Sequence, residues 1–126
     1  MFGRAFRPLG VVILVLSIAA GCGTRTSDFG IVDAPTGAAA DYEFLIPAGS
    51  GEASDRGEPL EILPGSLDVK VGEILEIVNE DDRGHLVGPF FVGADETIRH
   101  QFSSPGEFEG ICSVHPSGRI ILTVLP

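Results

Sequence analysis

The chain has 126 residues, a formal net charge of −10 at pH 7 and only two cysteines. This length suits one small domain rather than several. The acidic excess argues against nucleic-acid binding and against adsorption on anionic lipid, and it suits solubility outside the cell and basic partners.

Residues 1–21 are predicted to form a secretory signal. Arg4 and Arg7 supply a positively charged start, and an apolar run follows from Leu9 to Ala20. Small residues then provide a cleavage site, as signal peptides require. The apolar run is too short for a membrane span. Because the two arginines leave with the signal, the net charge of the mature chain falls from −10 to −12.

Cys22 follows Ala-Ala-Gly directly and resembles the cysteine of a bacterial lipoprotein signal. That resemblance implies cleavage before Cys22, lipid attachment to its sulfur, and a position on the outer face of the cytoplasmic membrane. The alternative is an ordinary secretory peptide with an incidental cysteine. If Cys22 is lipidated, Cys112 remains as a single unpaired thiol, which is open to oxidation unless it is buried or bound to metal.

Residues 22–40 are predicted to be the lipidated cysteine followed by a flexible tether. Gly, Thr, Ser, Ala and Asp dominate this segment, and such a composition favours a mobile linker. The alternative is that Phe29, Ile31 and Val32 form a short first strand.

From residue 41 onward the pattern predicts short strands separated by turns. Leu67–Val71 alternates apolar and polar residues, as a half-buried strand does. No stretch shows capped helical periodicity, and residues 48–58 are predicted to be a loop. Regularly spaced strands indicate an all-β sandwich or barrel over residues 41–126. The candidate strands are 42–47, 60–63, 67–71, 74–79, 85–92, 97–102, 107–112 and 119–125.

A polar turn precedes His85. Glu80, Asp81 and Asp82 lack the spacing of a calcium loop, and we expect them to form a solvated turn, with Asn79 fastening it to a neighbouring strand. Further along the chain, Phe90 and Phe91 cannot both face the core of a regular strand. One of the two rings is a candidate for an apolar surface patch.

Three residues form a candidate metal site: His85, Cys112 and His115. A thiolate and two imidazoles hold copper in blue-copper centres, because sulfur suits Cu(I) and nitrogen suits Cu(II). Zinc, mercury and silver are chemical alternatives, and zinc would keep an open fourth position. The third histidine, His100, lies in an alternating segment and is expected at the surface or an edge.

The order of these residues resembles the cupredoxin family of the plastocyanin type, over roughly residues 42–125. The segments that carry the resemblance are 64–73, 78–81 leading to His85, and 102–116 followed by a closing strand. It implies a Greek-key β-sandwich with His85, Cys112 and His115 as equatorial ligands of one copper ion. The chain departs from the family in one respect, because no methionine follows His115 and Met1 leaves with the signal. The axial position is left empty or filled by water, a backbone carbonyl or a side-chain oxygen, with Gln101 and Glu107 as candidates.

These features together predict a membrane-tethered copper protein that transfers single electrons. We expect a monomer that meets a redox or copper-handling protein and binds no nucleic acid. Copper buffering or delivery is one alternative, and a metal-free sandwich used for assembly is another. An enzyme with Cys112 as nucleophile and His115 as base is disfavoured, because no orienting acid or oxyanion-type glycine motif is evident.

Overall fold

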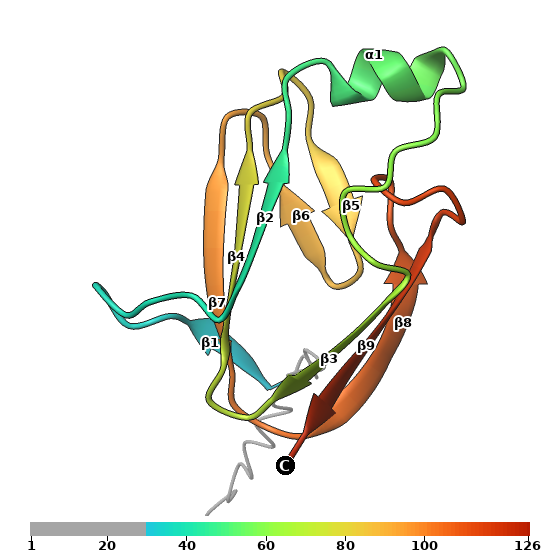
Figure 1. Ribbon diagram of the computed structural model, residues 1–126. Coiled ribbons are helices and arrows are strands. Elements are labelled where there is room, and N and C mark those ends of the chain that lie inside the picture. The colour runs from blue at the N-terminus through green and yellow to red at the C-terminus, as the bar shows by residue number, and fades with distance from the viewer. Residues whose placement is uncertain (1–29) are drawn as a thin grey trace, which may run out of the picture.

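A computed structural model describes residues 30–126, so the predicted signal, Cys22 and the first part of the tether lie outside the described residues. Nine strands and one short helix make up this part of the chain (Figure 1). None of its helices is long and apolar enough to cross a membrane. The elements are β1 (Ile31–Asp33), β2 (Tyr42–Ile46), α1 (Ser50–Asp55), β3 (Ser66–Lys70), β4 (Ile74–Asn79), β5 (His85–Val87), β6 (Phe90–Val92), β7 (Thr97–Phe102), β8 (Gly106–Ile111) and β9 (Arg119–Leu125).

The strands form three sheets. A four-stranded sheet has the order β1-β7-β4-β2, a three-stranded sheet has the order β3-β9-β8, and β5 pairs with β6 in a hairpin. Two pairs are parallel, β2 with β4 and β3 with β9, and the others are antiparallel. Helix α1 lies across the end of the sandwich opposite the C-terminus (Figure 1). The prediction of an all-β sandwich is confirmed.

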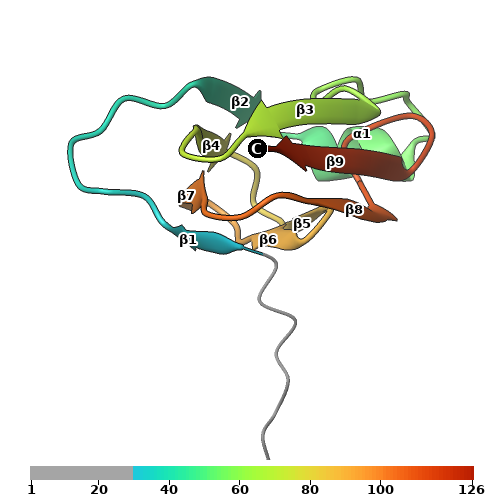
Figure 2. The same ribbon diagram turned by 90° about the horizontal axis from the view of Figure 1, so that it is seen from below.

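The core lies between the sheets, and strand alternation explains its composition. In β3, Leu67 and Val69 are buried while the three residues around them are exposed, as the sequence pattern predicts. Seen from the C-terminal end, strands of the different sheets lie on either side of a common interior (Figure 2). The side chains at the centre are Ile46, Leu63, Leu67, Val69, Leu75, Ile77, Val87, Phe90, Val92, Phe102, Cys112, Val114, Ile120, Leu122 and Val124.

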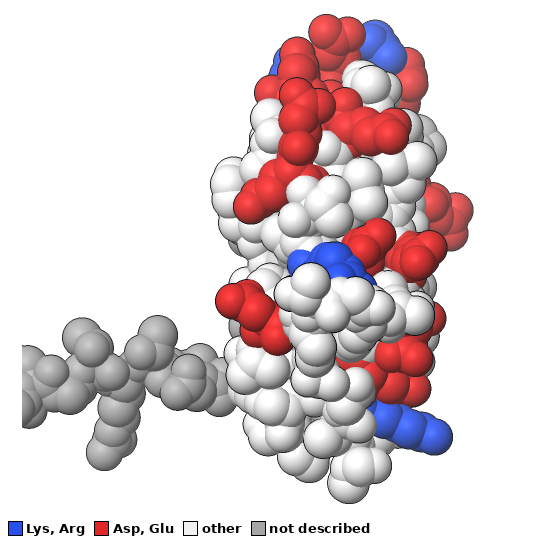
Figure 3. Space-filling model, turned by 90° about the vertical axis from the view of Figure 1, so that its left-hand side faces the viewer, with Lys and Arg blue, Asp and Glu red and all other residues white. Residues whose placement is uncertain are grey.

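Acidic side chains outnumber basic ones on the face that carries β7, and they gather at the end occupied by α1 (Figure 3). The helix and the turn after it contribute Glu52, Asp55 and Glu58. The excess of acidic side chains on this face is in line with the net charge of −10.

The tether prediction needs one correction. Residues 31–33 form β1, which pairs with β7 so that Ile31 lies opposite Phe102. The half-buried Ile31 also packs against the core, and burial of its side chain accounts for the order of this segment. The short first strand considered as an alternative is therefore present at Ile31 and Val32, while Phe29 lies outside the described residues.

Two further segments differ from the sequence prediction. Residues 60–63 are not a strand, although Leu63 is buried and Ile62 N–H donates to the Val114 carbonyl at 3.1 Å. Residues 50–55, predicted to be loop, form α1. The N-cap residue is Gly49, which has no side chain to accept a hydrogen bond from the first turn. The sequence therefore lacks the usual N-cap signal of a helix. Its capping acceptor comes from far along the chain, as described below.

Candidate metal centre

β5 and the end of β8 bring His85 and Cys112 onto one face. Val87 lies opposite Cys112 in an antiparallel bridge, and the Ser113 N–H donates to the Leu86 carbonyl at 2.9 Å. Side chains alternate along a strand, so His85 lies on the same face as Val87 and Cys112. All three are buried. Such diagonal neighbours stand roughly 7–8 Å apart, within reach of long and aromatic side chains.

The turn before His85 is held by Asn79. Its side-chain amide donates to the carbonyls of Arg83 at 2.7 Å and Gly93 at 2.8 Å, and its oxygen accepts the Asp81 N–H at 3.0 Å. The prediction that Asn79 fastens this turn is confirmed. The prediction of a solvated turn is wrong for Asp81, whose side chain is 0% exposed.

Burial of Asp81 is tolerated because hydrogen-bond donors surround its carboxylate. Its carboxylate accepts the Gly49 N–H at 3.0 Å, the Gly51 N–H at 2.8 Å and a hydrogen bond from His85 Nε2 at 2.8 Å. Burial alone raises the pKa of Asp81. The hydrogen bonds from His85 and from backbone N–H groups outweigh that effect and lower its pKa from 3.8 to about 2. Asp81 is therefore an ionised acceptor at neutral pH.

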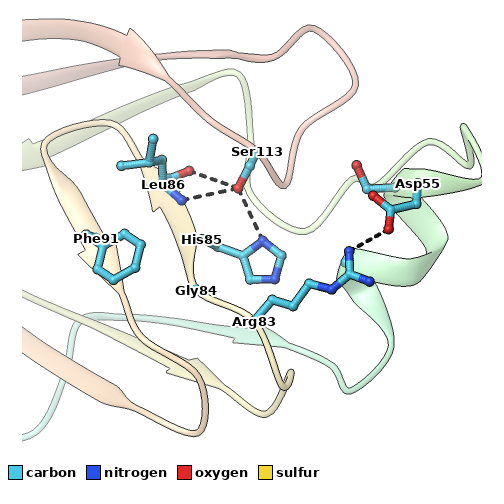
Figure 4. A pocket seen from close by; sticks show the side chains of 9 residues that line it. Asp55, Arg83, Gly84, His85, Leu86, Phe91 and Ser113 are labelled. Atoms are coloured by element: carbon cyan, nitrogen blue, oxygen red, sulfur yellow. Dashed lines mark hydrogen bonds and ion pairs between the residues drawn. The ribbon is translucent and has the colours of Figure 1, made fainter.

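The other ring nitrogen of His85 faces the segment that follows Cys112. His85 Nδ1 lies 3.2 Å from the hydroxyl oxygen of Ser113 (Figure 4). In a neutral imidazole with its proton on Nε2, Nδ1 has a free lone pair. That nitrogen is therefore available to accept a hydrogen bond from Ser113 or to bind a metal ion.

Cys112 is a buried free thiol. Burial raises its pKa, and a hydrogen bond from the Val114 backbone offsets only part of that effect. The neutral thiol is therefore favoured over the thiolate when no metal ion is bound. A bound cation would favour the thiolate instead.

His115 lies in the turn between β8 and β9. Its Nδ1 accepts the Ser117 N–H at 3.1 Å and lies 2.7 Å from the Ser117 hydroxyl oxygen. The ring also covers Gly65, where a Cβ would lie 3.2 Å from His115 Cε1. In this conformation His115 Nδ1 is hydrogen bonded to Ser117 in its own turn rather than to His85 or Cys112.

The structure therefore brings His85 and Cys112 onto one face but does not gather the full ligand set. Across residues 30–126, no three His, Cys, Asp or Glu side chains are close enough to share a metal ion. The residue types do fit copper, since they offer one thiol and two imidazoles. The carboxylate partner of His85 also fits, because metal-binding histidines usually donate their second N–H in this way. The assignment of these ligands stays a prediction.

Two neighbouring cavities open onto the candidate residues. One, of about 320 Å³, is lined by His85, Leu86, Phe91 and the Arg83–Asp55 ion pair (Figure 4). The other, of about 240 Å³, is lined by His115. Ser54 and Ser113 border both cavities. Phe91 is 63% exposed while Phe90 is buried, which confirms that only one of these rings faces the core.

Two residues of this region are not identified by the sequence pattern. The sequence around Asp81 predicts a solvent-exposed carboxylate. Its hydrogen-bond partners, Gly49 and Gly51, are about thirty residues away and cannot be recognised locally. Its spacing of four residues from His85 is a weak signal that could have found the pair. Ser113 carries no signal of its own, although it lies between Cys112 and His115. His100 does not join the site and instead stacks on Phe90, with 5.1 Å between the ring centroids.

Comparisons with known proteins find similar solved structures at low sequence identity. No protein-family model and no curated protein matches the chain. Among solved structures, it is similar to amicyanin from Paracoccus versutus, with 18% identity, a TM-score of 0.47, and coverage of 76% of this chain and 98% of that chain. It is also similar to a purple cupredoxin from Nitrosopumilus maritimus, with 22% identity, a TM-score of 0.43, and coverage of 68% and 100%.

A third similar structure is a mutant of amicyanin with Cu(I), at 16% identity and a TM-score of 0.43, covering 77% of this chain and 93% of that chain. The strands of the chain itself show an all-β sandwich. Identities and TM-scores of this size do not transfer a function, which must be supported by the chain's own residues.

Proposed function

We propose that the protein binds one copper ion through His85, Cys112 and His115 and transfers single electrons on the outer face of the cytoplasmic membrane. Cys22 would carry the lipid that tethers it there. The protein would act as a monomer that exchanges electrons with a redox partner protein.

One observation carries this proposal: His85 Nε2 lies 2.8 Å from the buried carboxylate of Asp81, and Nδ1 faces the segment that begins with Cys112. A histidine held in this way is prepared to donate a lone pair to a metal ion. The buried thiol next to it adds the soft ligand that distinguishes copper sites from carboxylate-rich ones.

Movements of several side chains would be needed to complete the ligand set. The Ser113 hydroxyl, which lies 3.3 Å from the Leu86 carbonyl, can donate there and release His85 Nδ1. His115 would turn away from Ser117, and Cys112 would lose its proton to solvent. Asp81 would keep the His85 ring fixed during these movements. Copper, when bound, supplies a reversible one-electron couple.

The test is copper reconstitution of the chain from residue 23 onward, which omits the signal and Cys22. We expect an intense thiolate-to-copper absorption band that disappears on reduction and returns on oxidation. Cys112→Ser should abolish the band, whereas His100→Gln, which changes the one histidine outside the site, should leave it intact. Absence of the band from the unmodified sequence would sink the proposal.

The membrane tether has its own test. The full chain, expressed with its leader in a bacterium, should incorporate labelled fatty acid and fractionate with membranes. Cys22→Ala should remove the label and release the protein. A labelled C22A variant, or an unlabelled wild-type protein, would contradict lipid attachment at this cysteine.

A second candidate function is copper buffering or delivery to another exported protein. The cavities favour it, because His85 and His115 each border an opening rather than a closed interior. Open ligands permit rapid metal exchange. This function predicts tight Cu(I) binding and fast transfer to a competing chelator, whereas a slowly exchanging, Cu(II)-preferring site would argue for electron transfer.

A further inference from the structure

We propose that Asp81 is a positioning residue that fixes the proton of His85 on Nε2 and couples the orientation of this ring to helix α1. The proposal deepens the copper site proposed above and rests on it for its metal-binding consequence. The position of the proton is a property of the metal-free protein and can be measured independently.

The contacts of Asp81 leave it little freedom. Oδ1 accepts the Gly49 N–H, and Oδ2 accepts both the Gly51 N–H and the hydrogen bond with His85 Nε2. Backbone N–H groups can only donate, so both carboxyl oxygens are used as acceptors. Because the ionised carboxylate has no proton to donate, His85 is the donor at Nε2, which leaves Nδ1 as the acceptor of a neutral ring.

The same carboxylate caps α1. The helix begins after Gly49, which has a φ of 86° and no side chain to act as a cap. Asp81 supplies the missing acceptor from about thirty residues away, in line with the preference of helix N-termini for negative charge. A shift of α1 would therefore move Asp81 Oδ2, the oxygen that contacts His85 Nε2.

Helix α1 packs closely against the turn before His85 at Gly51. A Cβ at this position would lie 3.0 Å from Asp81 Oδ2 and 2.6 Å from Arg83 Cδ. Arg83 in turn pairs with Asp55, at the other end of α1, at 2.6 Å. The turn before His85 is therefore attached to both ends of the helix, by Asp81 at one and Arg83 at the other.

The variant Asp81→Asn breaks this arrangement in either orientation of its amide. If the amide oxygen faces His85, the NH₂ group meets the Gly49 N–H, and two donors oppose each other. If the NH₂ group faces His85, it also meets the Gly51 N–H, and Nε2 must become the acceptor, so the proton moves to Nδ1. Asp82→Asn makes the same charge change at an exposed carboxylate one residue along and serves as the matched control.

The decisive measurement is the histidine tautomer, read from long-range ¹H–¹⁵N correlations of the metal-free chain at about pH 8, where histidines are ordinarily neutral. We expect wild type and D82N to carry the proton on Nε2 of His85, and D81N to shift it toward Nδ1. Amide exchange at Gly49 and Gly51 should accelerate in D81N alone. A proton on Nδ1 in wild type, or a D81N variant in which both the tautomer and the amide exchange at Gly49 and Gly51 are unchanged, would overturn the proposal.

Ser113→Ala provides a second variant if D81N fails to fold. It removes the other polar contact of the His85 ring, and the proton should stay on Nε2. A move to Nδ1 in S113A would show that Ser113, rather than Asp81, sets the tautomer, and it would overturn the proposal.

Copper affinity, measured by competition with a chelator, tests the metal-binding consequence. D81N should bind copper about 10–100-fold more weakly than wild type, as expected for loss of a group that orients a ligand, and D82N should match wild type. Equal affinities of D81N and wild type would refute positioning while leaving the proposed function intact. A wild-type protein that takes up no copper would refute the proposed function while leaving the tautomer result to stand.

Discussion

Acid should weaken the fold through Asp81 in a narrow and measurable range. Hydrogen bonds lower the pKa of this carboxylate from 3.8 to about 2 despite its burial. A depressed folded-state pKa means that the ionised carboxylate stabilises the native state above pH 3.8, and that this stabilisation is lost as the pH falls toward 2. A shift of nearly two pKa units corresponds to about 2 kcal/mol.

The assay is urea unfolding of the metal-free chain, in the presence of a chelator, between about pH 5 and pH 2. Many carboxylates titrate over this range, so the informative quantity is the difference in unfolding free energy between wild type and Asp81→Asn. That difference should shrink by about 2 kcal/mol as the pH falls. Asp82→Asn should show no such change relative to wild type. If the D81N difference is the same at both ends of the range, Asp81 does not stabilise the fold by being ionised.

Three further predictions concern packing and the thiol. Phe102→Ala should lower the free energy of unfolding by about 3–5 kcal/mol, because Phe102 is fully buried, whereas Phe91→Ala, at an exposed ring, should cost much less in the same urea titration. Gly51→Ala should destabilise by about 1–3 kcal/mol despite the better helix propensity of alanine, because its Cβ would collide with Arg83 and crowd Asp81; a stabilised G51A variant would contradict this fit. Cys112 should react with a thiol reagent far more slowly in the native metal-free protein than in urea, since burial raises its pKa and blocks access, and equal rates would show that the thiol is accessible.

Much of the fold was predictable because strand alternation is a local signal. The segments that became β3, β4, β7 and β9 each alternate or run apolar between clear turns, and the structure places them within a residue or so of the predicted bounds. The helix α1 was not predictable in this way. Its sequence, Ser-Gly-Glu-Ala-Ser-Asp, has weak helix propensity, and its cap comes from Asp81 on a distant turn.

The site was predictable in its residue types and not in its arrangement. Cys112 and His115 lie close in sequence, and the strand pairing that brings His85 beside Cys112 follows from the fold. No pattern in the sequence shows that His115 hydrogen bonds to Ser117 or that Asp81 is buried, because both depend on side-chain contacts that form only after the turns are in place. A turn with three acidic residues ordinarily faces water, and the backbone donors at the start of α1, together with His85, make burial of one of them favourable.

The position of β9 has a consequence for the order in which the protein folds. This strand follows the others in the described chain, yet it lies at the centre of its sheet, between β3 and β8, with Ser66 aligned to Ile121 across a long stretch of sequence. In that sheet β3 pairs only with β9. The long stretch of chain between β3 and β9 must therefore be closed into a loop before the three-stranded sheet can form. Non-local pairing of this kind slows folding, to milliseconds or longer in proteins dominated by it. Because the turn with Cys112 and His115 joins β8 to β9, we expect the thiol to become buried only when β9 pairs with β3.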